Sequence, residues 1–248
     1  MFLARLLIGR AIGRLVMLAL VLVVAGGAAW WFFVREDNQL ATAAPEIPEQ
    51  IRSAASSTPA AGSAAPATSS GAQVFTIVPE QSEAAYFAGE TLARLGVPST
   101  AKGATRDIKG QFALTADGLD TANTTAFTVG LKSLTSDQPR RDTQAQNALQ
   151  TSKFATATFT ATKVTGFPEE FPADADVSMQ LTGTLDLHGV QKEITWDVKA
   201  RKEGNALSAL ATTTFKYADF NITRPNIGGF VSVDEDVTLQ VQVIAVAS

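Results

Sequence analysis

Cysteine is absent from this chain of 248 residues, and histidine occurs once. Without cysteine there are no disulfides, thiolate metal sites or cysteine nucleophiles, and one histidine cannot supply a multi-histidine metal site. An excess of positive charge is also lacking, because 20 Lys and Arg face 24 Asp and Glu for a net charge of −4. A nucleic-acid binder needs a basic face that neutralises phosphates. We therefore expect no nucleic-acid partner, no metal and no cofactor.

Hydrophobic residues make up 46% of the chain, and one group of them is concentrated near the N-terminus. The segment from Leu15 to Val34 is uncharged and apolar, and about 20 such residues suffice for a helix that spans a membrane. Trp30 and Trp31 lie near its end, as aromatic residues do at a membrane interface. Three arginines precede it, namely Arg5, Arg10 and Arg14. By the positive-inside rule, the segment predicts a single-pass signal-anchor over 1–34, with a cytoplasmic N-terminus and the remainder extracytoplasmic, on the periplasmic or external face.

A cleaved signal peptide is the alternative interpretation of this segment. Ala41-Thr42-Ala43 has the small-x-small pattern of a cleavage site, but the apolar run is longer than a signal peptide usually has. Both interpretations place the rest of the chain on the same side of the membrane. Residues 35–73 are rich in Ala, Ser, Thr, Pro and Gly, a composition that predicts a disordered, flexible linker.

The remaining residues, 74–248, alternate repeatedly between apolar and polar side chains. Such alternation, with many Thr, Val, Ile and Phe, is typical of strands with one buried face. It occurs in eight segments, 74–78, 108–114, 127–131, 157–161, 179–188, 194–200, 207–215 and 237–245. Gly, Pro, Asn and Asp turns separate them, which indicates an all-β antiparallel sandwich or barrel. A proline followed by helix formers predicts one short helix over 139–150, and a second helix is expected over 88–95.

A family resemblance rests on motifs in a fixed order. Gly183 to Val198 reads GTLDLHGVQKEITWDV, two alternating strands around His188-Gly189-Val190. Its LDLHGVQK portion resembles a signature of the YceI-like lipid-binding family. Arg141-Asp142 resembles that family's Arg-Asp pair at a helix start, and the strand entry from Lys153 to Phe159 and the Asp219-Phe220 pair follow in the family's order.

The resemblance, which covers residues 74–248, implies a fold similar to lipocalins. It implies an extended eight-stranded antiparallel barrel with one or two short helices, whose interior holds a long isoprenoid chain. The sequence departs from the family at four places, where Gln81 and Gln144 replace histidines, Ala155 a proline and Asn221 a glycine. The missing histidines affect only a histidine-dependent head-group contact, because a lipid tail needs an apolar tunnel alone.

The inward-facing positions of the expected barrel alternate between large and small side chains. Small residues among large ones would leave a narrow slot, unless the aromatic rings fill the same space. The residue pattern leaves both outcomes open, and the resemblance favours a cavity. The small positions are Gly110, Ala157, Ala161, Gly183, Ala200, Ala209 and Ala211, and the large walls are Phe112, Phe127, Phe159, Leu185, Trp196 and Phe215. From these we expect a ligand to contact Phe112, Phe127, Ala157, Phe159, Trp196 and Phe215.

The polar candidates are fewer. Arg140 and Arg141 have guanidinium groups that match a diphosphate or quinone head group, and Arg141 is included in the expected ligand site, although a solvated helix start explains it as well. His188 beside Gly189 fits a tight turn better than a catalytic role. No G-x-S-x-G nucleophile motif is present.

These features favour a membrane-tethered protein that sequesters or carries an isoprenoid lipid of polyprenyl or quinone type. The alternatives are a ligand-free scaffold with a filled core and, less favoured, a hydrolase. No catalytic residue is predicted, because the single histidine would have to act as base from within a turn.

Overall fold

The structure is a computed structural model that describes residues 38–56, 71–92, 97–120, 125–172, 175–227 and 231–247. The chain divides into two units, Met1–Asn38 and Gln39–Ser248, and the fold belongs to the second. Within the described ranges no helix is both long and apolar enough to cross a membrane. The predicted span Leu15–Val34 lies outside these ranges.

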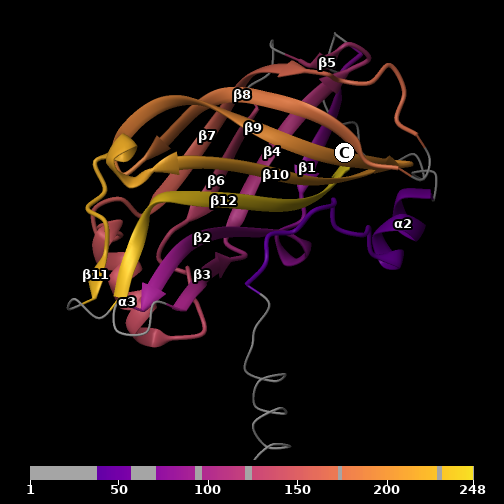
Figure 1. The fold of residues 1–248 in the computed structure, drawn as a ribbon. Coiled ribbons are helices and arrows are strands. Elements are labelled where there is room, and N and C mark those ends of the chain that lie inside the picture. The colour runs from indigo at the N-terminus through magenta and orange to yellow at the C-terminus, as the bar shows by residue number, and fades with distance from the viewer. Residues whose placement is uncertain are drawn as a thin grey trace, which may run out of the picture. The chain divides into compact units, whose positions relative to one another are not determined.

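Twelve strands form one antiparallel sheet, which curls into a barrel (Figure 1). Eight of them close the barrel, because the last pairs with the first. In sheet order these eight are β1 (Gln73–Ile77), β4 (Ile108–Thr115), β6 (Ala126–Gly130), β7 (Thr156–Thr165), β8 (Val177–Leu187), β9 (Val190–Glu203), β10 (Ala206–Lys216) and β12 (Val231–Ala247). They correspond one to one to the eight alternating segments of the sequence, so the predicted eight-stranded barrel is confirmed.

The other elements extend the barrel or cover it. A long hairpin of two strands continues the sheet beyond β12, and two very short strands pair with β4 and β12. These four are β2 (Glu83–Leu92), β3 (Val97–Thr105), β5 (Gly118–Leu119) and β11 (Asn226–Ile227). The helical elements are α2 (Glu49–Ser56), η1 (Pro79–Gln81), α3 (Pro139–Ala148) and η2 (Tyr217–Phe220). The helix predicted over 139–150 is α3, which begins at its proline.

The prediction of a helix over 88–95 is wrong, because residues 83–92 form strand β2. Alanine favours helices, and this segment lacks alternation because neighbouring residues are buried in succession. Ala84 and Ala85 are both buried, as are Phe87 and Ala88. A strand covered on both faces shows no period of two, so its pairing with β3 and β12 decides its structure.

The structure also differs from the disordered linker expected over 35–73, because residues 39–56 pack against the barrel. We call residues 39–56 the strap, because they lie against the outer surface of the barrel (Figure 1). Ile47 is 2% exposed and packs with Ala206 and Ile244. The Ser208 hydroxyl donates to the Pro45 carbonyl, and the Ala44 N–H donates to Asp176 at 3.0 Å. The composition of residues 35–73 as a whole does not reveal these contacts, because a few buried side chains and hydrogen bonds to the backbone suffice to fix a short segment.

Candidate functional site

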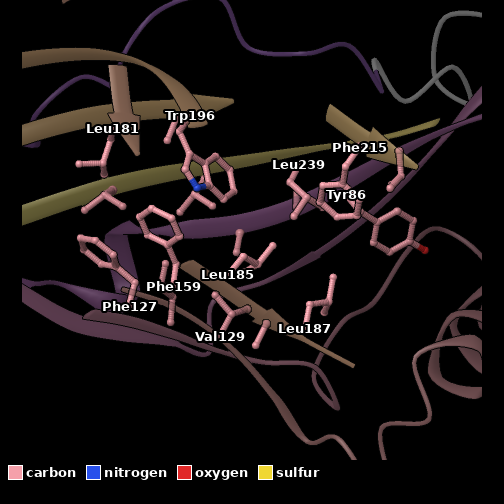
Figure 2. A pocket seen from close by; sticks show the side chains of 18 of the residues that line it. Tyr86, Phe127, Val129, Phe159, Leu181, Leu185, Leu187, Trp196, Phe215 and Leu239 are labelled. Carbon is pink, nitrogen blue, oxygen red and sulfur yellow. The ribbon is translucent and has the colours of Figure 1, made fainter. Parts of the chain in front are cut away.

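The barrel interior holds a cavity of about 290 Å³. All eight closing strands except β1 contribute side chains to its wall, as do β2 and α3. Its volume is near the lower end of the ~300–1,000 Å³ typical of small-molecule sites. Figure 2 shows aromatic and aliphatic side chains from several strands around a common space. The cavity favours a ligand-binding barrel over the scaffold alternative, which requires an interior filled by side chains.

One wall is built from aromatic rings in contact along neighbouring strands. The rings of Phe112 and Phe127 have centroids 6.0 Å apart, and Phe127 and Phe159 follow at 6.4 Å. Phe127 and Phe159 are directly opposed in the pairing of β6 with β7. The ring of Trp196 on β9 meets Phe159 edge-on at 5.9 Å. Cross-strand register therefore sets the order of the rings, which present a continuous apolar surface to the cavity.

Alanine side chains account for the empty space. Ala157, Ala200, Ala209 and Ala211 all line the cavity, and Ala200 and Ala209 are directly opposed between β9 and β10. A methyl group in place of a branched or aromatic side chain leaves interior volume unfilled. The three other small positions, Gly110, Ala161 and Gly183, do not line it. At Gly183 the strands approach so closely that an added Cβ would lie 2.2 Å from the Thr160 carbonyl oxygen, so this glycine permits close packing instead.

The indole nitrogen of Trp196 is buried and has no hydrogen-bond acceptor among the described residues. Figure 2 shows this nitrogen on the edge of the indole nearest Phe159. The two rings meet edge-on, with their centroids 5.9 Å apart. Trp196 is thus a wall residue with its polar atom turned toward an aromatic neighbour.

A small group of polar side chains lines the part of the cavity beside α3. Among the described residues that line the cavity, Arg141 is the only cation and Glu90 the only anion. The Arg141 Nη2 lies 3.2 Å from Glu90 Oε2, and its Nε donates to Glu90 Oε1 at 3.5 Å. These side chains are 16% and 10% exposed. The remaining Arg141 nitrogen, Nη1, is paired with Asp137.

Burial and ion pairing act in opposite directions on Arg141. Burial alone would lower the pKa of the guanidinium, but the hydrogen bond and charge of Glu90, together with Asp137, raise that pKa above its ordinary value. The residue therefore stays charged, as guanidinium groups do. Its neighbour Arg140 is exposed and does not line the cavity. Of the two arginines considered from the sequence, only Arg141 reaches the interior.

Two tyrosines, Tyr86 on β2 and Tyr217 at the start of η2, also belong to the polar group, as does Gln144 of α3. Burial is the main cause that raises the pKa of each phenol to about 12, and for Tyr217 the nearby Tyr86, Glu90 and Asp234 add to it. Both hydroxyls are therefore neutral and able to donate a hydrogen bond at neutral pH. The Tyr86 ring fits over Gly103 of the neighbouring strand, where an added Cβ would lie 2.3 Å from the ring.

All seven residues expected at the ligand site line the cavity: Phe112, Phe127, Ala157, Phe159, Trp196, Phe215 and Arg141. Sequence reasoning missed Glu90, Tyr86 and Tyr217. Glu90 and Tyr86 lie on β2, part of which was expected to be helical. The rarity of tyrosine in the sequence was a usable signal. The chain has two tyrosines, and both lie at the polar end of the cavity.

His188 lies in the β8–β9 turn and does not line the cavity. Its φ of +56° and that of Gly189, +75°, fit a two-residue hairpin of type I′, which confirms the turn interpretation. The Nδ1 of His188 is 3.1 Å from the Phe220 carbonyl oxygen, and its ring contacts Phe154 at 4.7 Å. These contacts tie the hairpin to η2. Among the described residues no cluster of acidic or histidine side chains could hold a metal ion.

Comparison with known proteins agrees with this architecture. The model of the YceI-like domain family matches residues 75–245. The fold is similar to that of Burkholderia cenocepacia BcnA, with a TM-score of 0.52, 15% identity, and coverage of 68% of this chain and 98% of that one. It is also similar to a polyisoprenoid-binding domain from Saccharophagus degradans implicated in plant cell wall breakdown, with a TM-score of 0.50, 16% identity and coverage of 70% and 98%. No curated protein matches the sequence.

Proposed function

The chain belongs to the YceI-like family, and from this premise we propose that its barrel binds an isoprenoid lipid of polyprenyl or quinone type and sequesters or carries it. One observation carries the proposal, namely an apolar cavity with polar side chains gathered beside α3. This arrangement suits a molecule with a long hydrocarbon tail and a small polar head. The similar domain from Saccharophagus degradans, described as polyisoprenoid-binding, supports the same ligand class.

The driving force for such binding comes from the tail. Each methylene removed from water contributes about 0.8 kcal/mol, so a chain of several isoprene units gains enough without strong head-group contacts. The aromatic wall of Phe112, Phe127 and Phe159 offers flat apolar surfaces to a chain with regularly spaced methyl branches. Binding by burial alone needs no activated nucleophile or proton donor, and we propose a binding protein, not an enzyme.

We place this binding protein on the outer side of a membrane, in the periplasm or at the external face. Support for this part comes from the sequence, in which the apolar segment Leu15–Val34 follows three arginines. An anchor would keep the barrel beside the bilayer in which isoprenoid lipids dissolve. Uptake and release of a lipid would then require only a short transfer between membrane and cavity.

Extraction of lipid from the purified full-length chain tests the binding proposal. Wild type should release an isoprenoid that mass spectrometry identifies. Ala157→Phe should fold but release much less, because the new ring would occupy part of the cavity that Ala157 lines. The control is Ala155→Phe, the same substitution at an exposed position two residues away.

The two variants also distinguish a cavity from a filled core. If Ala157→Phe unfolds more easily by roughly 1–3 kcal/mol, as overpacking predicts, and wild type carries no lipid, the chain is a scaffold. If the control loses lipid as completely as Ala157→Phe, occupancy of the cavity is not the cause of the loss.

A further inference from the structure

We propose that the barrel selects isoprenoids with an uncharged, oxygen-bearing head group and rejects their phosphorylated forms. This inference rests on the proposed function and specifies the ligand class of the same site. It follows from the way in which charged and neutral donors are distributed at the polar end of the cavity, where Arg141, Glu90, Tyr86 and Tyr217 gather.

The first observation is that the positive charge of Arg141 is already matched. Glu90 takes two of its nitrogens, at 3.2 Å and 3.5 Å, and Asp137 takes the third. One guanidinium with two carboxylates leaves this cluster with a net negative charge. A phosphate binds tightly to a guanidinium whose fork of N–H donors is free. Here each of the three nitrogens already donates to a carboxylate, so three of the five N–H donors are used.

The second observation concerns the cost of displacing Glu90. Its side chain is 10% exposed, and Arg141 is its ion-pair partner. If a phosphate took the place of Glu90 on Arg141, a buried carboxylate would remain beside a group that itself carries a charge of roughly −1.5 to −2. Leaving a buried charge unpaired is strongly unfavourable, and the added repulsion acts in the same direction.

Among the residues that the structure describes, no second cation lines the cavity, since its wall contains no lysine and no further arginine. Arg140 and Arg224 are exposed and do not line the cavity. Asp234 lies next to this end, since an added Cβ at Gly89 would touch its carboxylate, and its charge reaches Tyr217. The charges of the described residues at the polar end are therefore unfavourable to an anion.

The third observation is the presence of neutral donors. The hydroxyls of Tyr86 and Tyr217 have no hydrogen-bond partner in the part of the chain that the structure describes, and both residues line the cavity. Burial raises the pKa of each to about 12, so each keeps its proton. A phenol O–H donates well to a carbonyl or alcohol oxygen, which is the head-group chemistry that the site accommodates.

Three probes with the same number of carbons distinguish the contribution of the head group to affinity from that of the tail. They are geranylgeraniol, geranylgeranyl phosphate and the hydrocarbon phytane. The chain has three tryptophans, so the full-length variant Trp30→Phe/Trp31→Phe leaves Trp196 in the cavity wall as the only fluorophore of its kind. Quenching or enhancement of its emission reports binding. We expect the alcohol to bind at least about tenfold more tightly than the phosphate.

Glu90→Gln is the decisive variant, because it removes the negative charge beside Arg141 and keeps the side-chain shape. Arg141 stays paired with Asp137, so the net charge of the cluster changes from negative to zero. The alcohol-to-phosphate preference should fall by about tenfold or reverse. The matched control is Glu83→Gln on the same strand. It breaks the ion pair between Glu83 and Lys102, whose charged atoms are 2.8 Å apart, and neither residue lines the cavity. This control should keep the wild-type preference.

The outcomes separate the two levels of the proposal. If all three probes bind with similar affinity, or if the phosphate binds best, the head-group inference is overturned while tail binding stands. If none of the three binds to the wild-type cavity, the proposed function fails and the inference fails with it. If Glu83→Gln changes the preference as much as Glu90→Gln, the charge of Arg141 is not its cause.

Discussion

Gln240 binds the backbone of Ala41 through both ends of its side-chain amide. Its Oε1 accepts a hydrogen bond from the Ala41 N–H and its Nε2 donates to the Ala41 carbonyl, each at 2.9 Å. Gln240 is 3% exposed although it points outward from β12. The strap therefore satisfies a polar side chain that it also buries. Without the strap, that amide would keep only its hydrogen bond to the Thr212 hydroxyl, at 3.1 Å, within the described residues.

The strap should contribute measurably to the stability of the barrel. Ile47→Ala removes its most deeply buried apolar side chain, which packs on Ala206 and Ile244, and we expect a loss of about 2–4 kcal/mol in the free energy of unfolding. Leu40→Ala is the matched control, because Leu40 belongs to the same segment but is 44% exposed. Denaturant unfolding of the full-length variants measures both. Equal effects of the two substitutions would mean that the strap does not dock as described.

The two tyrosines make the polar end of the cavity visible in a pH titration. The chain contains no other tyrosine, so tyrosinate absorbance reports only Tyr86 and Tyr217. In the folded protein we expect the titration midpoint near 12, and in denaturant near the ordinary value of 10.0. A folded-state midpoint close to 10.0 would show that the phenols are not buried against the cavity wall.

The same shift has a consequence for stability. A phenol whose pKa is raised on folding holds its proton more tightly in the folded state, so its contribution is complete below pH 10 and is lost as pH rises from 10 to 12. A rise from 10.0 to about 12 corresponds to roughly 3 kcal/mol for each tyrosine. Tyr217→Phe should therefore lose less stability than wild type over this range, as measured by alkaline unfolding. An identical alkaline loss in the variant would exclude Tyr217 as a source.

The absence of cysteine allows a direct test of the proposed topology. Ala4→Cys and Ser152→Cys would each introduce the only thiol of the chain, and Ser152 is exposed in a turn. A membrane-impermeant maleimide added to intact spheroplasts should label Ser152→Cys and leave Ala4→Cys unlabelled until the membrane is disrupted. The reverse pattern, or recovery of the unprocessed chain in the cytosol, would contradict an anchored extracytoplasmic barrel.

How much of this fold the sequence predicts depends on whether a segment has one buried face. β8 alternates regularly from Met179 to Leu187 because its outer face meets water, and this alternation predicts the strand. β2 is buried in succession at Ala84 and Ala85, so its pattern contains no period to detect. The strap was missed for a related reason, since its buried residues Ala44 and Ile47 lie in a segment rich in alanine and proline without a regular apolar period.

The candidate site also has a part that the sequence predicts and a part that it does not. The apolar wall could be predicted because inward positions follow from alternation, and Phe112, Phe127 and Trp196 all line the cavity as expected. The pairing of Arg141 with Glu90 could not, because these residues are 51 positions apart and meet only when α3 packs beside the β2–β3 hairpin. Sequence position alone does not indicate that the charge of Arg141 is already matched, and this pairing changes which head group the site should accept.

Tyr86→Phe tests the donor role of the phenol without changing its packing. The ring remains seated over Gly103, and only the hydroxyl is lost. If the hydroxyl donates to the head group, geranylgeraniol should bind about 3- to 10-fold more weakly, the range expected for one neutral hydrogen bond. Phytane has no head-group oxygen, so its affinity should stay unchanged. Fluorescence of Trp196 in the Trp30→Phe/Trp31→Phe background measures both affinities, and Tyr217→Phe provides the parallel test of the second phenol. A parallel loss of phytane binding would show that Tyr86 acts through packing, and unchanged affinity for both probes in the two phenol variants would remove the tyrosines from head-group recognition.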